Sequence, residues 1–202
     1  MPKVIRKETI LDAALHCFTQ KGYYKATMDL IAEEAGISKP GLYSHFASKD
    51  DLFVSLFSYM GDKYFQQILT HLEKTDSPEK QLQLFGEKTC QIWQENEPFY
   101  RFALEFVSIS ARETTIRTIM TSYYQSAIDT FKTIIRNGKR KGQFKTVNAD
   151  MAAHSFYFMI MGQFFISQAV NANIDTNKQL RFNIKSLLAA IKDTSFHVPV
   201  EN

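Results

Sequence analysis

The fold of this chain is decided by residues 27–52, which read TMDLIAEEAGISKPGLYSHFASKDDL. Their apolar spacing predicts two short helices, and Gly36 interrupts the chain between them. Thr27 and Ser38 are the predicted N-caps, because a hydroxyl there can accept a hydrogen bond from a free N–H of the first turn. Pro40 occupies the first turn of the second helix, where its missing N–H costs no hydrogen bond. The stretch therefore predicts a helix-turn-helix.

Helical spacing continues on both sides of this stretch. A helix is predicted to end at Gly22, and Ser48 with Asp51 predicts a capping box at the start of a fourth helix. Asp150 is the predicted cap of a late apolar helix. The remaining helices are predicted over residues of about 6–21, 79–95, 98–110, 113–137, 150–172 and 175–192. The expected fold class is all-α, with about nine helices in total.

Composition and charge set limits on the class of protein. A length of 202 residues suits one compact unit or two small ones, and a net charge of +3 neither requires nor excludes DNA. Cys17 and Cys90 lie far apart in apolar, helical surroundings, which predicts buried free thiols and a cytoplasmic location. The N-terminus lacks a signal-peptide core, and Met151–Ile166 is shorter than the ~20 residues of a membrane span, so no membrane partner is expected.

The second helix of a helix-turn-helix can lie in the major groove of DNA with its N-terminal residues facing the base edges. Lys39 brings a cation to that position, and Gly41 allows the backbone to approach closely. Lys49 begins the next helix, where free N–H groups attract phosphate. Phe46 is expected in the core. The candidate DNA-binding residues are Thr27, Ser38, Lys39, Pro40, Gly41, Tyr43, Ser44, His45 and Lys49.

The stretch from Thr27 to Leu52 resembles the DNA-binding signature of the TetR family, and the preceding residues from Ile10 to Tyr23 are similar to the family's first helix. The resemblance implies an all-α homodimer in which three N-terminal helices bind a palindromic operator in double-stranded DNA. It implies DNA contacts through Thr27, Ser38, Lys39, Gly41, Tyr43, His45 and Lys49, whereas Ser44 replaces an aromatic residue often found there. The implied domains are a helix-turn-helix DNA-binding domain over residues 1–48 and an effector-binding and dimerisation domain over residues 49–202.

The second part of the chain is rich in aromatic residues and methionine, a composition that suits a pocket for a small apolar or aromatic effector. For any single one of these residues a place in the core is favoured, but as a set they exceed what a small helical bundle needs. The candidate effector-binding residues are Trp93, Tyr100, Phe102, Glu105, Phe106, Tyr123, Tyr124 and Phe158.

Residues 151–166, within the helix expected over residues 150–172, are apolar almost all round, so this helix needs cover on two sides. Its own domain can supply one side and a two-fold mate the other, which together with the last helix predicts a four-helix dimer interface. The candidate interface residues are Ala153, Phe156, Ile160, Phe164, Ile184, Leu187, Leu188 and Ile191.

The function expected from these features is a ligand-responsive transcriptional regulator, in the first place a repressor that a small effector releases from its operator. An activator of the same fold and a helical ligand-binding protein without DNA function are the alternatives. An enzyme is not expected, because the sequence carries no glycine-rich phosphate loop, no paired metal-ligand histidines and no nucleophile motif. No cofactor or metal is expected either.

Overall fold

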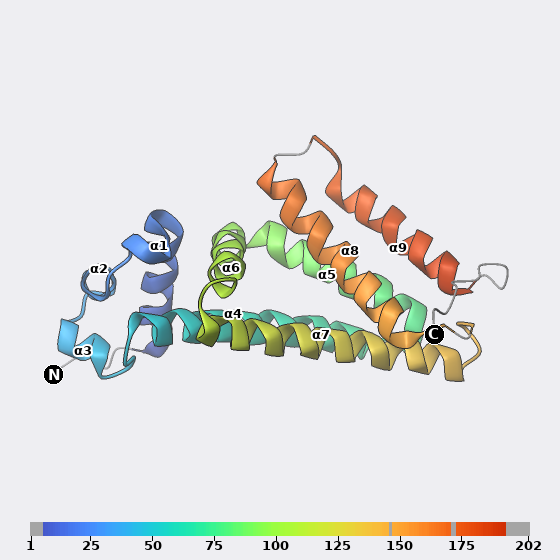
Figure 1. Cartoon of the computed structure of the whole chain (residues 1–202), viewed down its shortest axis with the longest axis horizontal. Coiled ribbons are helices and arrows are strands. Elements are labelled where there is room, and N and C mark those ends of the chain that lie inside the picture. The colour runs from blue at the N-terminus through green and yellow to red at the C-terminus, as the bar shows by residue number, and fades with distance from the viewer. Residues whose placement is uncertain (1–5, 146, 171–172, 193–202) are drawn as a thin grey trace. The chain divides into compact units, whose positions relative to one another are not determined.

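The computed structural model describes residues 6–145, 147–170 and 173–192. Within these residues the chain forms nine helices and no strand (Figure 1), which confirms the expected all-α class. The helices are α1 (Lys7–Lys25), α2 (Met28–Glu34), α3 (Lys39–Tyr43), α4 (Lys49–Leu72), α5 (Pro78–Glu95), α6 (Glu97–Ser110), α7 (Thr114–Arg140), α8 (Ala149–Ala169) and α9 (Thr176–Lys192).

The described residues fall into two compact units. The first contains residues 6–65 and 93–121, and the second contains residues 66–92, 122–145, 147–170 and 173–192. The long helices α4 and α7 each contribute to both units. This division follows packing. The functional boundary between residues 48 and 49 is a separate matter and stays a prediction.

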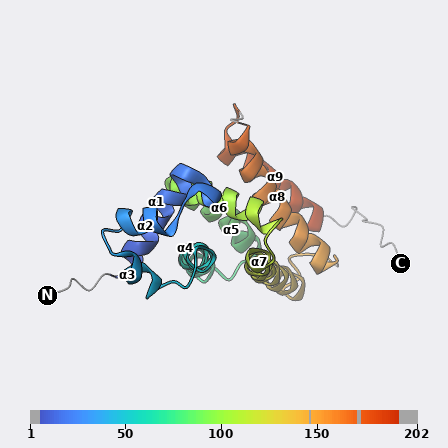
Figure 2. The same ribbon diagram turned by 60° about the vertical axis from the view of Figure 1, so that its left-hand side comes forward.

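The helices α2 and α3, which are labelled in Figure 2, begin directly after the predicted caps. The Thr27 hydroxyl accepts a hydrogen bond from the N–H of Leu30 at 3.2 Å, and the Ser38 hydroxyl accepts one from Gly41 at 3.2 Å. Ser48 accepts the N–H of Asp51 at 3.0 Å, which confirms the predicted start of α4. The Asp51 carboxylate returns to the N–H of Ala47 and not to Ser48, one residue from the expected pairing.

An aromatic core holds the first unit together. Phe18, Phe53, Phe102 and Phe106 are fully buried, and they come from α1, α4 and α6. The ring of Phe53 lies 4.9 Å from those of Phe18 and Phe102 and 5.2 Å from that of Phe106, measured between centroids. Phe46 is also buried, as expected. This core connects α6 to the helices that carry the helix-turn-helix.

The second unit packs α5, α8 and α9 with the later part of α7. Gly86 of α5 allows a close approach, because a Cβ there would lie 2.6 Å from a methyl carbon of Ile184. The turn after α7 closes through Gly142, whose φ of +66° favours glycine, and the ring of Phe144 then packs against Gly138. The described helices include none with the length and hydropathy that a bilayer crossing requires.

Two details of the second unit bear on the sequence predictions. Asn148, and not Asp150, caps α8, because its side-chain oxygen accepts the N–H groups of Asp150 and Met151 at 3.0 and 3.2 Å. The Asp150 carboxylate instead lies 2.5 Å from the ammonium group of Lys132 on α7. The hydrogen bond from Lys132 lowers the pKa of Asp150. The sequence prediction of Asp150 as the cap is therefore wrong.

Candidate nucleic-acid interface

The predicted DNA-binding residues gather around the short helix α3. Leu42 is fully buried and anchors this helix to the unit, while Tyr43 on its other side is 45% exposed. Of the nine candidates, all except Gly41 and Lys49 have exposed side chains. The structure thus brings most of the predicted residues to an accessible surface, and their contact with DNA stays a prediction.

Lys39 is held by a neighbour that the sequence prediction missed. Its ammonium group lies 2.7 Å from a carboxylate oxygen of Asp29 on α2, and both side chains are mostly exposed. The hydrogen bond to Asp29 raises the pKa of Lys39, so the ammonium stays charged at neutral pH. A phosphate or base that approaches Lys39 must therefore compete with this carboxylate. Ten residues separate the pair along the chain, so only the turn between α2 and α3 brings them together.

The side chains beyond Lys39 differ in how freely they can meet DNA. The Ser44 hydroxyl donates to the carbonyl of Gly41 at 2.7 Å, so it is used within the end of α3. The His45 side chain is exposed, with its ring centroid 6.4 Å from that of the buried Phe46. Tyr43 and His45 are therefore the most accessible hydrogen-bonding side chains of this helix end.

Lys49 was predicted to contact a phosphate, and in the structure its side chain lies against Tyr23 of α1. Its ammonium group donates to the carbonyl oxygen of Tyr23 at 2.8 Å and lies 4.4 Å from the centroid of the Tyr23 ring. A carbonyl and an aromatic face both attract a cation, and together they hold this side chain half-buried. In this conformation Lys49 contacts α1, and one of the three N–H donors of its ammonium group is used by the carbonyl of Tyr23.

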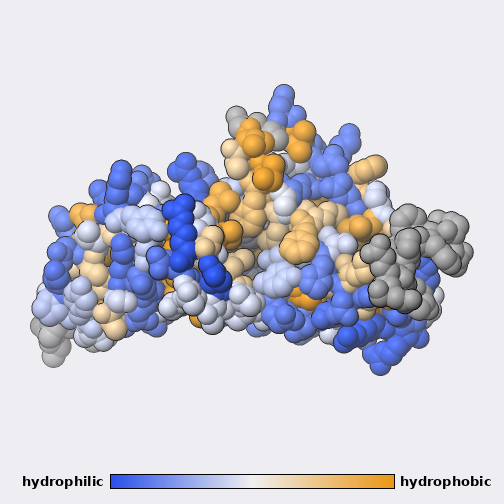
Figure 3. All heavy atoms as spheres, in the orientation of Figure 1, coloured by the Kyte–Doolittle hydropathy of each residue, from blue (hydrophilic) through white to orange (hydrophobic). Residues whose placement is uncertain are grey.

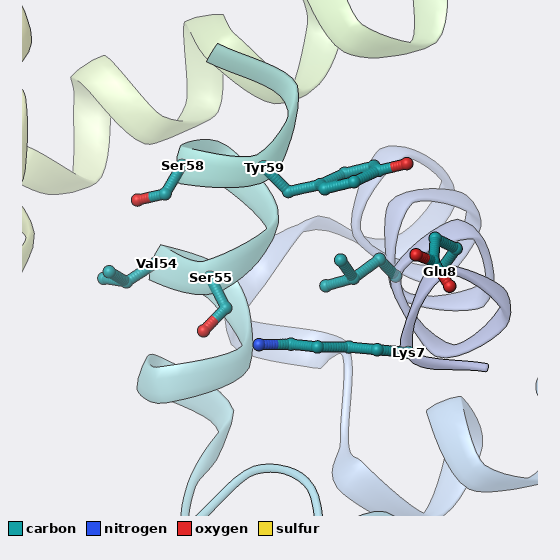
Figure 4. Close-up of a pocket in the computed structure, with 7 residues that line it drawn as sticks. Lys7, Glu8, Val54, Ser55, Ser58 and Tyr59 are labelled. Atoms are coloured by element: carbon teal, nitrogen blue, oxygen red, sulfur yellow. The ribbon is translucent and has the colours of Figure 1, made fainter. Parts of the chain in front are cut away.

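A cavity of about 300 Å³ lies within the first unit, between α1 and α4. Figure 4 shows Lys7 extending from α1 toward Ser55 of α4, and Tyr59 of α4 extending toward α1 near Glu8. The cavity is lined by Lys7, Glu8, Leu11, Val54, Ser55, Ser58 and Tyr59. No sequence pattern marks it, since its polar residues come from two helices that only the fold brings together.

A second cavity, of about 350 Å³, lies in the second unit. It is lined by Leu72, Gln81, Asp129, Thr130, Thr133, Ile134 and Asn137. Neither of these two cavities in the described part of the chain is lined by a predicted effector-binding residue.

The predicted effector-binding residues fall into separate groups. Phe102 and Phe106 are fully buried in the aromatic core, so they serve packing in this conformation. Trp93 packs against Tyr100, with ring centroids 5.7 Å apart. The Glu105 carboxylate accepts a hydrogen bond from the backbone N–H of Tyr23. For the aromatic residues among these candidates, the structure favours a place in the hydrophobic core over a place in a ligand pocket.

The members of the set that belong to the second unit are Tyr123, Tyr124 and Phe158. Tyr124 stacks on Phe158 with centroids 6.1 Å apart, and Tyr157 packs edge-on against Tyr124 at 5.0 Å. Phe158 is 59% exposed, so this aromatic group of α7 and α8 reaches the surface. Contact with an effector stays a prediction for all three residues.

The predicted dimer-interface residues lie on α8 and α9, where they pack into the core of their own unit. All of them except the half-buried Leu187 are buried within the unit itself, so their contact with a second chain stays a prediction. Other residues on the same helices are more exposed. Exposed apolar side chains of α8 and α9 are available, and Figure 3 shows apolar atoms gathering over the C-terminal end of α8. The exposed apolar residues along the two helices are Met151, Phe158 and Ile166 of α8 and Phe182 of α9.

Comparison with known proteins places residues 10–56 in a described family, since they match the model of "bacterial regulatory proteins, tetR family". The HTH-type transcriptional regulator YuxN of Bacillus subtilis is 41% identical over 73 residues, which are 36% of this chain and 25% of YuxN. The HTH-type transcriptional activator FasR of Mycolicibacterium smegmatis is 31% identical over 105 residues, which are 52% of this chain and 48% of FasR. The chain thus spans less than half the length of these curated relatives.

A solved structure extends the likeness to most of the chain. The transcriptional regulator FadR from Bacillus subtilis, in complex with stearoyl-CoA, superposes with a TM-score of 0.81 at 17% identity. The match covers 91% of this chain and 98% of FadR. At this identity the likeness concerns the fold alone.

Proposed function

We propose that this chain, whose residues 10–56 match the model of the tetR family of bacterial regulatory proteins, is a member of that family and a ligand-responsive DNA-binding transcriptional regulator that acts in the cytoplasm. The observation that carries the proposal is the helix-turn-helix itself. Its two helices begin at hydroxyl caps, and the start and end of α3 present exposed polar side chains. Residues 1–48 serve DNA binding in this proposal, and residues 49–202 serve effector binding and dimerisation.

The DNA contacts are proposed to form when α3 enters the major groove. Lys39 at its start and Tyr43 and His45 at its end are the side chains best placed to meet bases and phosphates. The N-terminal N–H groups of α2, next to Thr27, are available for a phosphate. Lys49 joins these contacts through the N–H donors of its ammonium group that the carbonyl of Tyr23 leaves unused.

A homodimer is proposed to place two copies of α3 on one palindromic operator. Half-sites lie about 34 Å apart, or a multiple of that distance, so the spacing of the two copies governs affinity. The exposed apolar residues of α8 and α9, including Phe158 and Phe182, are the proposed contact surface. Burial of such residues against a two-fold mate would remove apolar surface from water.

Repression is the proposed mode, with release by a small apolar or aromatic effector. The bound stearoyl-CoA of the FadR structure suggests long-chain acyl-CoA as the first compound to test. Activation is the second candidate, because FasR, which is named an activator, matches half of this chain.

Selection from a library of random-sequence DNA duplexes tests the proposal. The purified chain should enrich a palindromic sequence, and gel-shift titration should then show that an effector weakens its binding. Stearoyl-CoA is the probe in that titration, with free coenzyme A as the control. Failure to enrich any sequence, with only weak salt-sensitive binding to all duplexes, would refute the assignment as an operator-binding regulator.

A further inference from the structure

Tyr23 lies at a break in α1 where three helices of the first unit meet. Gly22, directly before it, has φ +76° and ψ 162°, a backbone region that essentially only glycine adopts. The chain resumes with one more turn, closed by a hydrogen bond from Ala26 N–H to the carbonyl of Gly22 at 3.0 Å. The break turns the backbone of Tyr23 away from the ladder of α1, so its polar groups find partners on other helices.

Each polar group of Tyr23 has a charged partner on another helix. Its backbone N–H donates to the carboxylate of Glu105 on α6, and its hydroxyl donates to the carboxylate of Asp50 on α4. Its carbonyl accepts from the ammonium group of Lys49 on α4 at 2.8 Å. One residue of α1 is thus bonded to the start of α4 and to the middle of α6.

The hydrogen bonds at this junction of α1, α4 and α6 are expected to stabilise it strongly, because Tyr23 is buried and its partners are charged. Tyr23 is buried, and hydrogen bonds to charged groups contribute more than those between neutral groups. Burial, followed by the hydrogen bond to Asp50, raises the pKa of the Tyr23 hydroxyl, which therefore stays a donor at neutral pH. A Cβ on Gly22 would lie only 3.2 Å from the carboxylate of Glu105, so glycine also provides the space that Glu105 occupies.

We propose that Glu105 is a positioning residue for DNA binding: by holding the N–H of Tyr23, it fixes the end of α1 against the start of α4 and so links α6 to the helix-turn-helix. The inference rests on the proposed function. It adds a residue on a helix that carries none of the predicted DNA contacts. A shift of α6 along its axis would move the Glu105 carboxylate, and with it the end of α1 from which α2 begins.

The sequence around Glu105 offers a matched control. Glu97 lies on the same helix, is exposed, and forms only a loose pair with Arg101 at 3.6 Å. Glu97→Gln therefore removes the same charge from α6 without touching Tyr23. Glu105→Ala removes the acceptor of the Tyr23 N–H, whereas Glu105→Gln keeps a carbonyl oxygen that can still accept it.

The experiment measures the affinity of each variant for two duplexes at the same salt concentration. One is the sequence that the wild-type chain enriches from a random library, and the other is a mixed-sequence duplex of equal length. Glu105→Ala should bind the enriched duplex about tenfold more weakly, the size expected from one lost hydrogen bond to a charged acceptor. It should bind the mixed-sequence duplex as the wild type does. Glu105→Gln should recover most of the loss, and Glu97→Gln should match the wild type.

Hydrogen exchange at the amide of Tyr23 provides a readout that does not depend on DNA. Exchange at this amide should become faster in Glu105→Ala, less so in Glu105→Gln, while the amide of Phe18 within α1 stays protected. If Glu105→Ala does not fold, Glu105→Gln alone must show the intermediate exchange and affinity.

The possible outcomes separate the inference from the function on which it rests. If the wild type enriches a sequence and Glu105→Ala binds it equally well, or loses affinity for both duplexes alike, the positioning role is wrong and the regulator assignment stands. If the wild type enriches nothing, both fall.

Discussion

Replacement of Asp29 by asparagine tests how the pair of Asp29 and Lys39 controls contact with DNA. The carboxylate of Asp29 lies 2.7 Å from the Lys39 ammonium, on the surface proposed to face the duplex. Asp29→Asn removes a negative charge from that surface and frees Lys39 to neutralise a phosphate. We therefore expect tighter binding to DNA of any sequence, together with a smaller difference between the operator and other duplexes.

The magnitude follows from counterion release. Each additional neutralised phosphate steepens the slope of log affinity against log salt by about 0.9. Between about 50 and 200 mM salt, one new contact then adds about a 3.5-fold loss of affinity, and two contacts in a dimer add about 12-fold. Asp29→Asn should therefore bind more tightly than the wild type at low salt, and its advantage should shrink as salt rises.

Fluorescence anisotropy titrations at several salt concentrations measure this slope. Glu33→Gln is the matched control, because it removes an exposed carboxylate from the same helix without freeing Lys39. The double variant Asp29→Asn with Lys39→Ala should lose the steeper slope. If Asp29→Asn has the slope of Glu33→Gln, Lys39 gains no phosphate when it is released, and the reasoning about this pair is refuted.

Three further predictions concern the core, the dimer and pH. Phe53→Ala should lower the free energy of unfolding by about 3–5 kcal/mol in denaturant titrations, because its fully buried ring packs against four others; a loss below about 1 kcal/mol would contradict that packing. Phe182→Ser, at a side chain 66% exposed, should shift sedimentation toward the monomer with little loss of thermal stability, whereas Ile184→Ala should mainly destabilise; an unchanged dimer in Phe182→Ser would exclude this surface. Burial raises the pKa of the Cys90 thiol from 9.0 to about 11. Between these pH values the unfolded chain releases the thiol proton more readily than the folded chain, so the contribution of the protonated thiol to stability is complete below about pH 9 and is lost as pH rises toward 11. Cys90→Ala should therefore lose less stability than the wild type between these pH values, and parallel pH profiles would contradict the shift.

Local signals predicted the helix boundaries well. The caps at Thr27, Ser38 and Ser48 could be predicted because a cap and its N–H partner lie within three residues of each other. The cap of α8 was predicted at the wrong residue, because Asn148 and Asp150 are both good caps in isolation. Only the tertiary contact with Lys132 shows why Asp150 is used elsewhere.

Burial within the chain could not be predicted from apolar periodicity. An aromatic side chain at helical spacing has the same pattern whether it faces a neighbouring helix or a ligand, so the sequence made Phe102 and Phe106 pocket candidates, and the structure buries both in the aromatic core. The predicted dimer residues are buried within their own unit for a related reason. The most regular apolar stripe of a helix packs first against its own unit, as Phe156 and Ile184 do. The side chains left for a partner, such as Phe182, break that regularity.

Charged side chains are the hardest to place from sequence, because their partners lie far along the chain. Glu105 was a candidate for an effector and Lys49 for a phosphate, yet both bind the backbone of one residue, Tyr23. This shared partner bears on the proposed link between α6 and the helix-turn-helix within the first unit. An effector need not touch Glu105 to act on DNA binding, since any ligand that moves α6 also moves the acceptor of the Tyr23 N–H. Lys49 keeps two N–H donors beside the one that the carbonyl of Tyr23 accepts, so in the proposed function the junction at Tyr23 bears on both a DNA contact and the position of the helix-turn-helix.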